Sequence, residues 1–144
     1  MDGIYSLEAE CFGESAWSQK EFEASVSDSS HVTLFAALFK GGDGTDVPVG
    51  FLMLGHAADE GEIMNIAVRG DFRRRGIGRR LMAAAEAYAQ LLGVRVIFLE
   101  VRAANEGARA LYERVGYFKA AVRRGYYKSP KDDAVIMKKH IGET

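Results

Sequence analysis

The order of segments between residues 62 and 101 constrains the fold more than any other feature of this sequence. A strand-like segment (62–68) and a nearly continuous apolar segment (94–101) flank one long amphipathic segment (76–92). In this middle segment apolar residues recur at helical spacing, and Gly93 is a suitable helix C-cap. Strand, helix and strand in this order predict one parallel crossover connection inside a sheet.

The remaining segments extend this unit into a mixed, mostly antiparallel sheet. Asn105 is expected to cap a helix over residues 106–115, and two further helices are expected before residue 31. Short Gly- and Asp-rich turns join the early strands, so these strands should pair antiparallel. The other strands are expected at residues 32–40, 47–56, 117–124 and 134–140. We therefore expect an α/β (α+β) fold with helices on both faces of the sheet.

Length and composition exclude several classes of protein. The chain has 144 residues, which suits a single domain over residues 1–144. Lys and Arg number 19 against 20 Asp and Glu, so no overall charge favours nucleic acid or a membrane surface. A single cysteine cannot form an internal disulfide, and no apolar run approaches the ~20 residues that span a bilayer. The N-terminus lacks a signal-peptide pattern, so we expect a cytoplasmic protein that contacts neither nucleic acid nor membrane.

An arginine-rich turn precedes the long helix and has the properties of an anion site. The first turn of a helix leaves amide groups unpaired and carries partial positive charge. Gly76 and Gly78 allow a bulky anion to approach this backbone. Leu81 stands where a dinucleotide fingerprint requires glycine, and the Gly-Lys-Ser/Thr of a nucleotide P-loop is absent. The alternative interpretation is a glycine-softened helix start with solvated arginines.

Four ordered blocks resemble those of a known superfamily. They are residues 65–68 (NIAV), 73–79 (RRRGIGR), 99–105 (LEVRAAN) and 110–117 (ALYERVGY). In this order they resemble the GNAT superfamily of acetyl-CoA-dependent N-acetyltransferases. Within it the chain is most similar to RimI-type enzymes, which acetylate the N-terminal α-amine of a ribosomal protein. The resemblance covers almost the whole chain and implies the GNAT fold.

The resemblance implies a role for each matching position, with acetyl-CoA as co-substrate and no metal. Glu100 resembles the general base, and Tyr112 resembles the acid that protonates the departing thiolate. Asn105 is expected to contact the cofactor. The backbone groups implied in holding the pantetheine and pyrophosphate are those of Ile66, Ala67, Val68, Arg74, Arg75, Gly76, Ile77, Gly78 and Arg79. The candidates for binding the acceptor are Trp17, Tyr126 and Tyr127.

Two departures from the family pattern concern the N-terminal part. RimI-type proteins carry a strand before the first helix, and this chain starts too late to contain it, so we expect the sheet to lack the first strand. The family's Phe-Pro-Trp-Ser is here Ser15-Ala16-Trp17-Ser18. Loss of the proline loosens a loop that shapes the acceptor site.

The chemistry of the reaction makes a single carboxylate base reasonable. An amine attacks a thioester only when it is neutral, and the pKa of an α-amine (~7.7–8.0) lies well below that of lysine (~10.4). We expect desolvation at the end of an apolar strand to raise the pKa of Glu100 and improve it as a base. Each role has an alternative: Glu100 paired with an arginine such as Arg102, Tyr112 in the core, Asn105 as a cap only, and Tyr126 and Tyr127 as strand packing.

Three functions remain open from the sequence. The first is a RimI-type protein N-terminal acetyltransferase. The second is a GNAT enzyme for a small amine, which would favour an acidic pocket built from Glu62, Glu100, Asp132 and Asp133. The third is a CoA-binding module without catalysis, against which the presence of both Glu100 and Tyr112 argues. The oligomeric state and the physiological acceptor are not determined by the sequence.

Overall fold

The computed structural model describes residues 31–40 and 46–142. The elements are β1 (Val32–Lys40), β2 (Asp46–Ala57), β3 (Glu60–Val68), the 3-10 helix η2 (Gly70–Phe72), α3 (Ile77–Leu91), β4 (Val96–Arg102), α4 (Glu106–Arg114), β5 (Phe118–Lys128) and β6 (Lys131–His140). The expected N-terminal helices, the expected lack of a first strand, and Trp17 all lie outside the described residues.

The six strands form one mixed sheet in the order β1-β2-β3-β4-β6-β5. β3 and β4 pair in parallel, from Glu60 opposite Val96 to Ile63 opposite Leu99. The pairs β1–β2, β4–β6 and β5–β6 are antiparallel. The crossover predicted from the strand-helix-strand order is therefore confirmed, and α3 is the helix that makes it.

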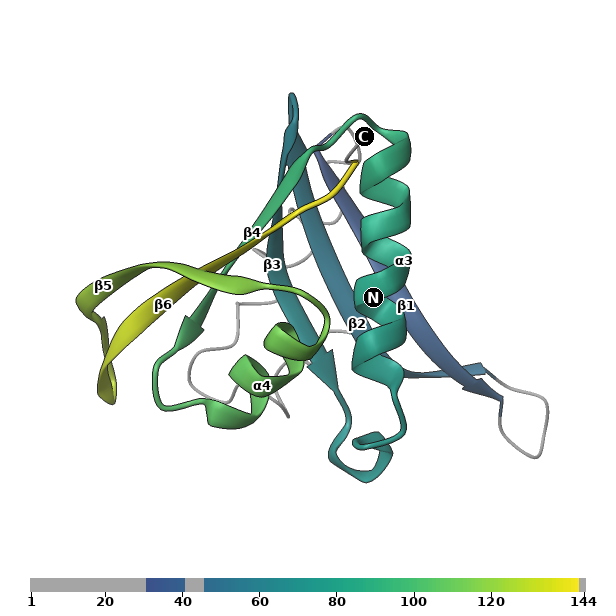
Figure 1. Cartoon of the computed structure of the whole chain (residues 1–144). Coiled ribbons are helices and arrows are strands. Elements are labelled where there is room, and N and C mark those ends of the chain that lie inside the picture. Colours follow the sequence, from purple (N-terminus) through teal and green to yellow (C-terminus); the bar gives the residue numbers. More distant parts are fainter. Residues whose placement is uncertain (1–30, 41–45, 143–144) are drawn as a thin grey trace. The chain divides into compact units, whose positions relative to one another are not determined.

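The chain divides into two compact units, and the first comprises residues up to Gly55 together with Met64–Ala87. Its core is built on β2, where Phe51, Leu52, Met53 and Leu54 are all fully buried. A Cβ at Gly50 would lie 3.2 Å from the Ile77 side chain at the start of α3. Glycine therefore allows this helix to approach the strand closely, and α3 follows the arginine-rich turn in Figure 1.

The second unit comprises His56–Ile63 and Tyr88–Thr144. Along β4 the burial alternates, and Ile97, Leu99 and Val101 point into the core. Leu99 lies opposite Met137 of β6, which is also buried. β5 and β6 form the long two-stranded ribbon labelled in Figure 1.

The β5–β6 hairpin extends further than the sequence predicted. The expected strands ended at residue 124 and began at residue 134, whereas β5 reaches Lys128 and β6 starts at Lys131. Gly125 adopts a positive φ of 63° and its amide donates to Asp133 Oδ1 at 2.8 Å. This glycine absorbs a register shift, after which Tyr127 pairs with Asp132. The predicted boundaries were wrong because Gly125 forms a bulge inside β5, so the strand continues beyond it.

Leu99→Ala should lower the free energy of unfolding by about 2–5 kcal/mol, because it leaves a cavity beside Met137. Leu91 on α3 is the matched control because its side chain is 85% exposed, and Leu91→Ala should change stability by less than about 0.5 kcal/mol. Urea unfolding followed by circular dichroism measures both. Equal effects of the two substitutions would contradict this description of the core.

Candidate functional site

The turn between β3 and α3 has the backbone geometry that an anion site requires. Arg74 and Gly76 adopt left-handed conformations with φ of 64° and 79°. The first helical hydrogen bond runs from the Arg80 amide to the Gly76 carbonyl at 3.1 Å. The amides of Ile77, Gly78 and Arg79 therefore belong to the first helical turn, which has no acceptor within the helix. Such a turn can bind phosphate through its backbone.

Several arginine side chains of this turn are used to hold the loop itself. Arg73 Nε donates to the Val68 carbonyl at 3.0 Å, and Arg69 forms an ion pair with Asp71 at 3.1 Å. The guanidinium of Arg75 lies 4.8 Å from the centroid of the Phe72 ring. These side chains therefore stabilise the conformation of the loop. The groups that suit an anion are the backbone amides at the start of α3.

The end of β3 continues beyond its parallel pairing. The ladder with β4 ends at Ile63 opposite Leu99, although β3 extends to Val68. Ile66, Ala67 and Val68 therefore follow the last parallel pair. Ala67 is buried, and its two neighbours are half-buried. Where a strand extends beyond its last pair with a neighbouring strand, a ligand can form hydrogen bonds to its backbone.

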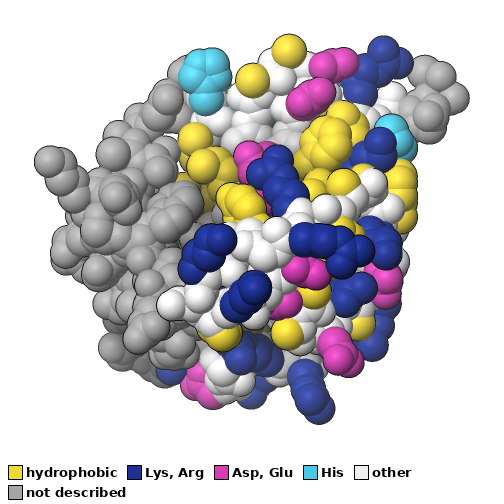
Figure 2. Space-filling view, turned by 90° about the vertical axis from the view of Figure 1, so that its left-hand side faces the viewer, with side chains coloured by type: hydrophobic (Ala, Val, Ile, Leu, Met, Phe, Trp, Pro, Cys, Tyr) yellow, Lys and Arg dark blue, Asp and Glu magenta, His cyan; other side chains and the backbone are white. Residues whose placement is uncertain are grey.

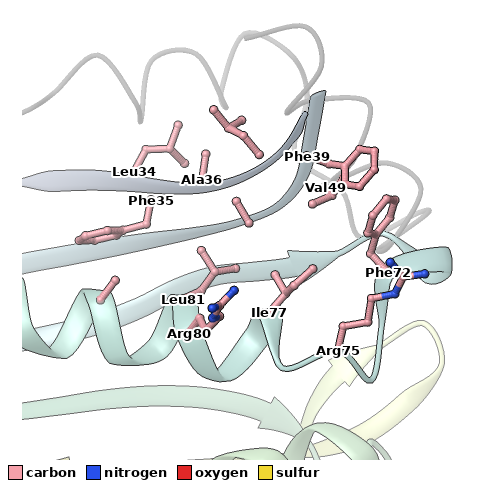
Figure 3. A pocket seen from close by; sticks show the side chains of 13 residues that line it. Leu34, Phe35, Ala36, Phe39, Val49, Phe72, Arg75, Ile77, Arg80 and Leu81 are labelled. Atoms are coloured by element: carbon pink, nitrogen blue, oxygen red, sulfur yellow. The ribbon is translucent and has the colours of Figure 1, made fainter. Parts of the chain in front are cut away.

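The first unit also contains an open cavity of about 750 Å³ that sequence reasoning did not predict. Most of its wall comes from apolar residues of β1 and α3, and Figure 3 shows Leu81 and Ile77 on α3 facing the strands. Phe72 and Arg75 close one end, where the Phe72 ring lies 5.2 Å from that of Phe39. Of the predicted site residues, Arg75 and Ile77 line this cavity. The apolar pattern of residues 32–40 predicted a strand but gave no indication of a cavity beside it.

Glu100 lies on β4 in the second unit with 28% of its side chain exposed. Its carboxylate lies 3.6 Å from Arg123, whose side chain is 60% exposed. An ion pair this exposed contributes only about 0–1 kcal/mol, so it leaves the carboxylate available for a ligand. The expected alternative partner, Arg102, instead donates to the carbonyls of Ser129 and Pro130.

A second carboxylate lies near Glu100. Glu62 stands opposite Phe98 in the parallel ladder, which puts Glu62 and Glu100 on the same face of the sheet. The pKa of Glu62 is raised by partial burial and, to a smaller extent, by the negative charge of Glu100. Sequence reasoning gave Glu62 only a minor part in an acidic pocket. Alternation of side chains along the two strands could have placed Glu62 on the face of Glu100. That inference also needs the register between the strands, which the sequence does not give.

The helix α4 carries the two other predicted residues of this unit. Asn105 Oδ1 accepts a hydrogen bond from the Ala108 amide at 3.1 Å, which confirms that Asn105 caps the helix. Tyr112 is 7% exposed, and burial, with a smaller contribution from Tyr127, raises its pKa to about 12. Tyr112 is therefore a neutral phenol over the physiological pH range.

The two tyrosines of the hairpin differ in exposure. Tyr126 is 47% exposed, and its ring meets the half-buried ring of Tyr127 edge to face at 5.2 Å. Burial raises the pKa of Tyr127, and the Glu100 carboxylate raises it further, whereas the Arg102 guanidinium opposes both. In the second unit, electrostatic effects thus connect Glu62 with Glu100, Glu100 with Tyr127, and Tyr127 with Tyr112.

The side chains of Asp132 and Asp133 bind backbone amides of their own unit. Asp132 Oδ2 accepts from the Ala104 amide at 3.0 Å, and Asp133 Oδ1 accepts from Gly125. The hairpin is otherwise rich in cations, and many Lys and Arg side chains appear on the face shown in Figure 2, the side on which Figure 1 labels β5 and β6. The basic residues of the hairpin are Lys119, Arg123, Arg124, Lys128, Lys131, Lys138 and Lys139.

Two kinds of feature are absent from the described residues. None of the described helices is long and apolar enough to cross a membrane. Among the residues that the structure describes, no three His, Cys, Asp or Glu side chains are placed to share a metal ion.

Comparison with known proteins identifies relatives over most of the chain. Residues 1–117 match the acetyltransferase (GNAT) family. The [ribosomal protein bS18]-alanine N-acetyltransferase of Salmonella typhimurium is 46% identical over 81 residues, which are 55% of this chain and 55% of that protein. This chain therefore spans about half the length of the curated relatives that it matches.

Solved structures show the same fold. The crystal structure of the ribosomal-protein-S18-alanine N-acetyltransferase from Escherichia coli superposes with a TM-score of 0.86 at 32% identity, covering 99% of this chain and 88% of that one. A putative streptothricin acetyltransferase from Bacillus anthracis, solved in complex with acetyl coenzyme A, has a TM-score of 0.68 at 24% identity and covers 77% of this chain and 63% of that one.

Gly76→Ala should lower the free energy of unfolding by about 1–2 kcal/mol, because a side chain at a φ of 79° is strained even where space is open. Gly70→Ala is the matched control from the same loop, since a Cβ there meets nothing within 4 Å and the backbone is not left-handed. Denaturant unfolding should show no loss of stability for Gly70→Ala. A Gly76→Ala protein as stable as wild type would mean that the turn has a different conformation.

Tyr112 should ionise only near pH 12, about two pH units above an ordinary tyrosine. Because the folded pKa lies above the unfolded one, the resulting contribution to stability is present below about pH 10 and is lost as pH rises toward 12. Phenolate absorbance during a pH titration of wild type, minus that of Tyr112→Phe, isolates this group. A difference curve centred near pH 10 would show that Tyr112 is not buried.

Proposed function

Because the chain belongs to the GNAT family of acetyltransferases, we propose that it transfers the acetyl group of acetyl-CoA to the N-terminal α-amine of a protein. By analogy with the relatives named for ribosomal protein bS18, the acceptor is the N-terminus of a ribosomal protein. The observation that carries the proposal is the electrostatic grouping of Glu100, Tyr112 and Tyr127 in the second unit.

Acetyl-CoA would be held mainly by backbone groups of the first unit. The amides from Arg74 to Arg79 include those of the first turn of α3, which suits a pyrophosphate. The backbone from Ile66 to Val68 follows the last parallel pair of β3 and would bind the pantetheine and polarise the thioester carbonyl. Asn105, besides capping α4, remains a predicted contact to the cofactor.

The acetyl transfer needs one proton acceptor and one hydrogen-bond donor. The neutral amine attacks the thioester carbonyl carbon, the bond from carbon to sulfur breaks, and the amine gives a proton to Glu100. A pKa of about 12 for Tyr112 lies above the ~8.5 of an ordinary thiol, so full proton transfer to the thiolate is uphill. Tyr112 therefore stabilises the departing sulfur by donating a hydrogen bond. The proton on Glu100 passes to solvent, from which the thiolate is protonated.

A small-molecule amine is the second candidate acceptor. A polyamine or aminoglycoside would favour a cluster of carboxylates, but Asp132 and Asp133 bind the amides of Ala104 and Gly125. Only Glu62 and Glu100 remain of the four acidic residues considered, and the nearby hairpin is cationic. These observations favour a peptide acceptor.

The test uses acetyl-CoA with short peptides that differ in their first residue. An Nα-blocked lysine peptide and spermidine serve as the competing amine classes, and thiol release and product mass are followed. Turnover with free α-amines alone is the expected result. Turnover with spermidine or lysine but with no free N-terminus would contradict the proposal, and cofactor binding without any acetylated product would favour a non-catalytic module.

Glu100→Gln should reduce turnover at neutral pH by at least about 100-fold, because it removes the proton acceptor. The dissociation constant of acetyl-CoA should stay the same, and the residual rate should rise with pH as more of the amine becomes neutral. Glu113→Gln, an exposed glutamate on α4, is the matched control and should retain full activity. Unchanged turnover of the Glu100→Gln protein would remove Glu100 from this role.

A further inference from the structure

Arg102 occupies an unusual position at the end of β4. It is two residues beyond Glu100, so the two side chains leave the same face of the strand. Its guanidinium lies over the ring of Tyr127, with 4.1 Å from Cζ to the ring centroid. The same group donates to the Pro130 carbonyl at 2.8 Å and to the Ser129 carbonyl at 3.2 Å. One side chain therefore contacts both the tyrosine ring and the turn that follows it.

The pairing of β5 with β6 does not by itself fix the Tyr127 ring. The register shifts between Arg123 and Tyr127, so this part of β5 is locally irregular. Two backbone amides attach the segment after β4 to the hairpin: that of Ala104 donates to the Asp132 side chain at Oδ2, and that of Ala103 donates to the Asp133 carbonyl at 2.9 Å. These contacts hold the main chain, whereas the stacked guanidinium contacts the Tyr127 ring itself.

The position of Tyr127 matters because this side chain lies near the two predicted chemical groups. The negative charge of Glu100 contributes to the raised pKa of Tyr127, and Tyr127 in turn contributes to the raised pKa of Tyr112. A half-buried tyrosine with its polar tip at such a place can contact an extended peptide while its ring stays packed.

We infer that Arg102 is a positioning residue that fixes the Tyr127 ring for the acceptor peptide, which rests on the proposed function. A planar guanidinium can stack on a ring and donate to two carbonyls at once. A lysine ammonium has one point of charge and cannot reproduce both contacts. Arg102 acts through Tyr127 and through the turn at Ser129 and Pro130, and it takes no part in proton transfer.

The test is a double-mutant cycle of Arg102→Gln and Tyr127→Leu, with initial rates measured against an acceptor peptide and against acetyl-CoA. Arg102→Gln should raise the KM for the peptide about tenfold, with kcat and the KM for acetyl-CoA within about twofold of wild type. Arg102→Lys should recover only part of the loss. In the Tyr127→Leu background, Arg102→Gln should have almost no further effect, because the ring through which it acts is gone.

The control is Arg114→Gln, an exposed arginine on α4, which should leave every parameter unchanged. A merely structural role for Arg102 would lower kcat and the melting temperature together at constant peptide KM, and that result overturns the inference. Additive effects in the cycle also overturn it. Failure of the wild-type protein to acetylate any peptide would contradict the proposed function instead, so the two failures are distinguishable.

Discussion

The parallel pairing of β3 with β4 is the constraint on which the other features of this protein depend. The pairing requires the crossover through α3, and the crossover puts the arginine-rich turn directly after the end of β3. The ladder with β4 pairs Glu60 to Ile63 of β3. The rest of β3, as far as Val68, extends beyond this pairing. The register of these four pairs puts the side chains of Glu62 and Glu100 on the same face of the sheet. One short ladder thus determines where β3 leaves β4 and which face of the sheet carries Glu62 and Glu100.

Much of this arrangement could be predicted from the sequence because it depends on local rules. Helical spacing, the Asn105 cap and the glycines next to Arg75 predict α3, α4 and the turn between β3 and α3. What could not be predicted required register or long-range contact. The bulge at Gly125 extended the hairpin, and the ladder register made Glu62 a neighbour of Glu100. The sequence also offered Arg102 as the partner of Glu100, whereas the folded hairpin gives it Tyr127.

The chemistry of the second unit is governed by desolvation more than by ion pairs. Tyr112 and Tyr127 hold their protons more tightly mainly because they are buried, and Glu62 does so for the same reason. The ion pair that does involve Glu100 is long and exposed. A carboxylate with a weak partner beside neutral phenols suits a reaction that moves a proton off an amine near neutral pH. The side chains of Asp132 and Asp133, which the sequence also offered for an acidic pocket, instead accept hydrogen bonds from backbone amides.

We propose that backbone amides of the first unit hold the pyrophosphate and pantetheine of acetyl-CoA. Hydrogen exchange with and without CoA tests it most directly, because it reports on amides rather than on side chains. We expect slower exchange at residues 66–68 and 74–79 when CoA binds, with little change in the β5–β6 hairpin. CoA binding that leaves the exchange of these amides unchanged would show that they do not hold the cofactor.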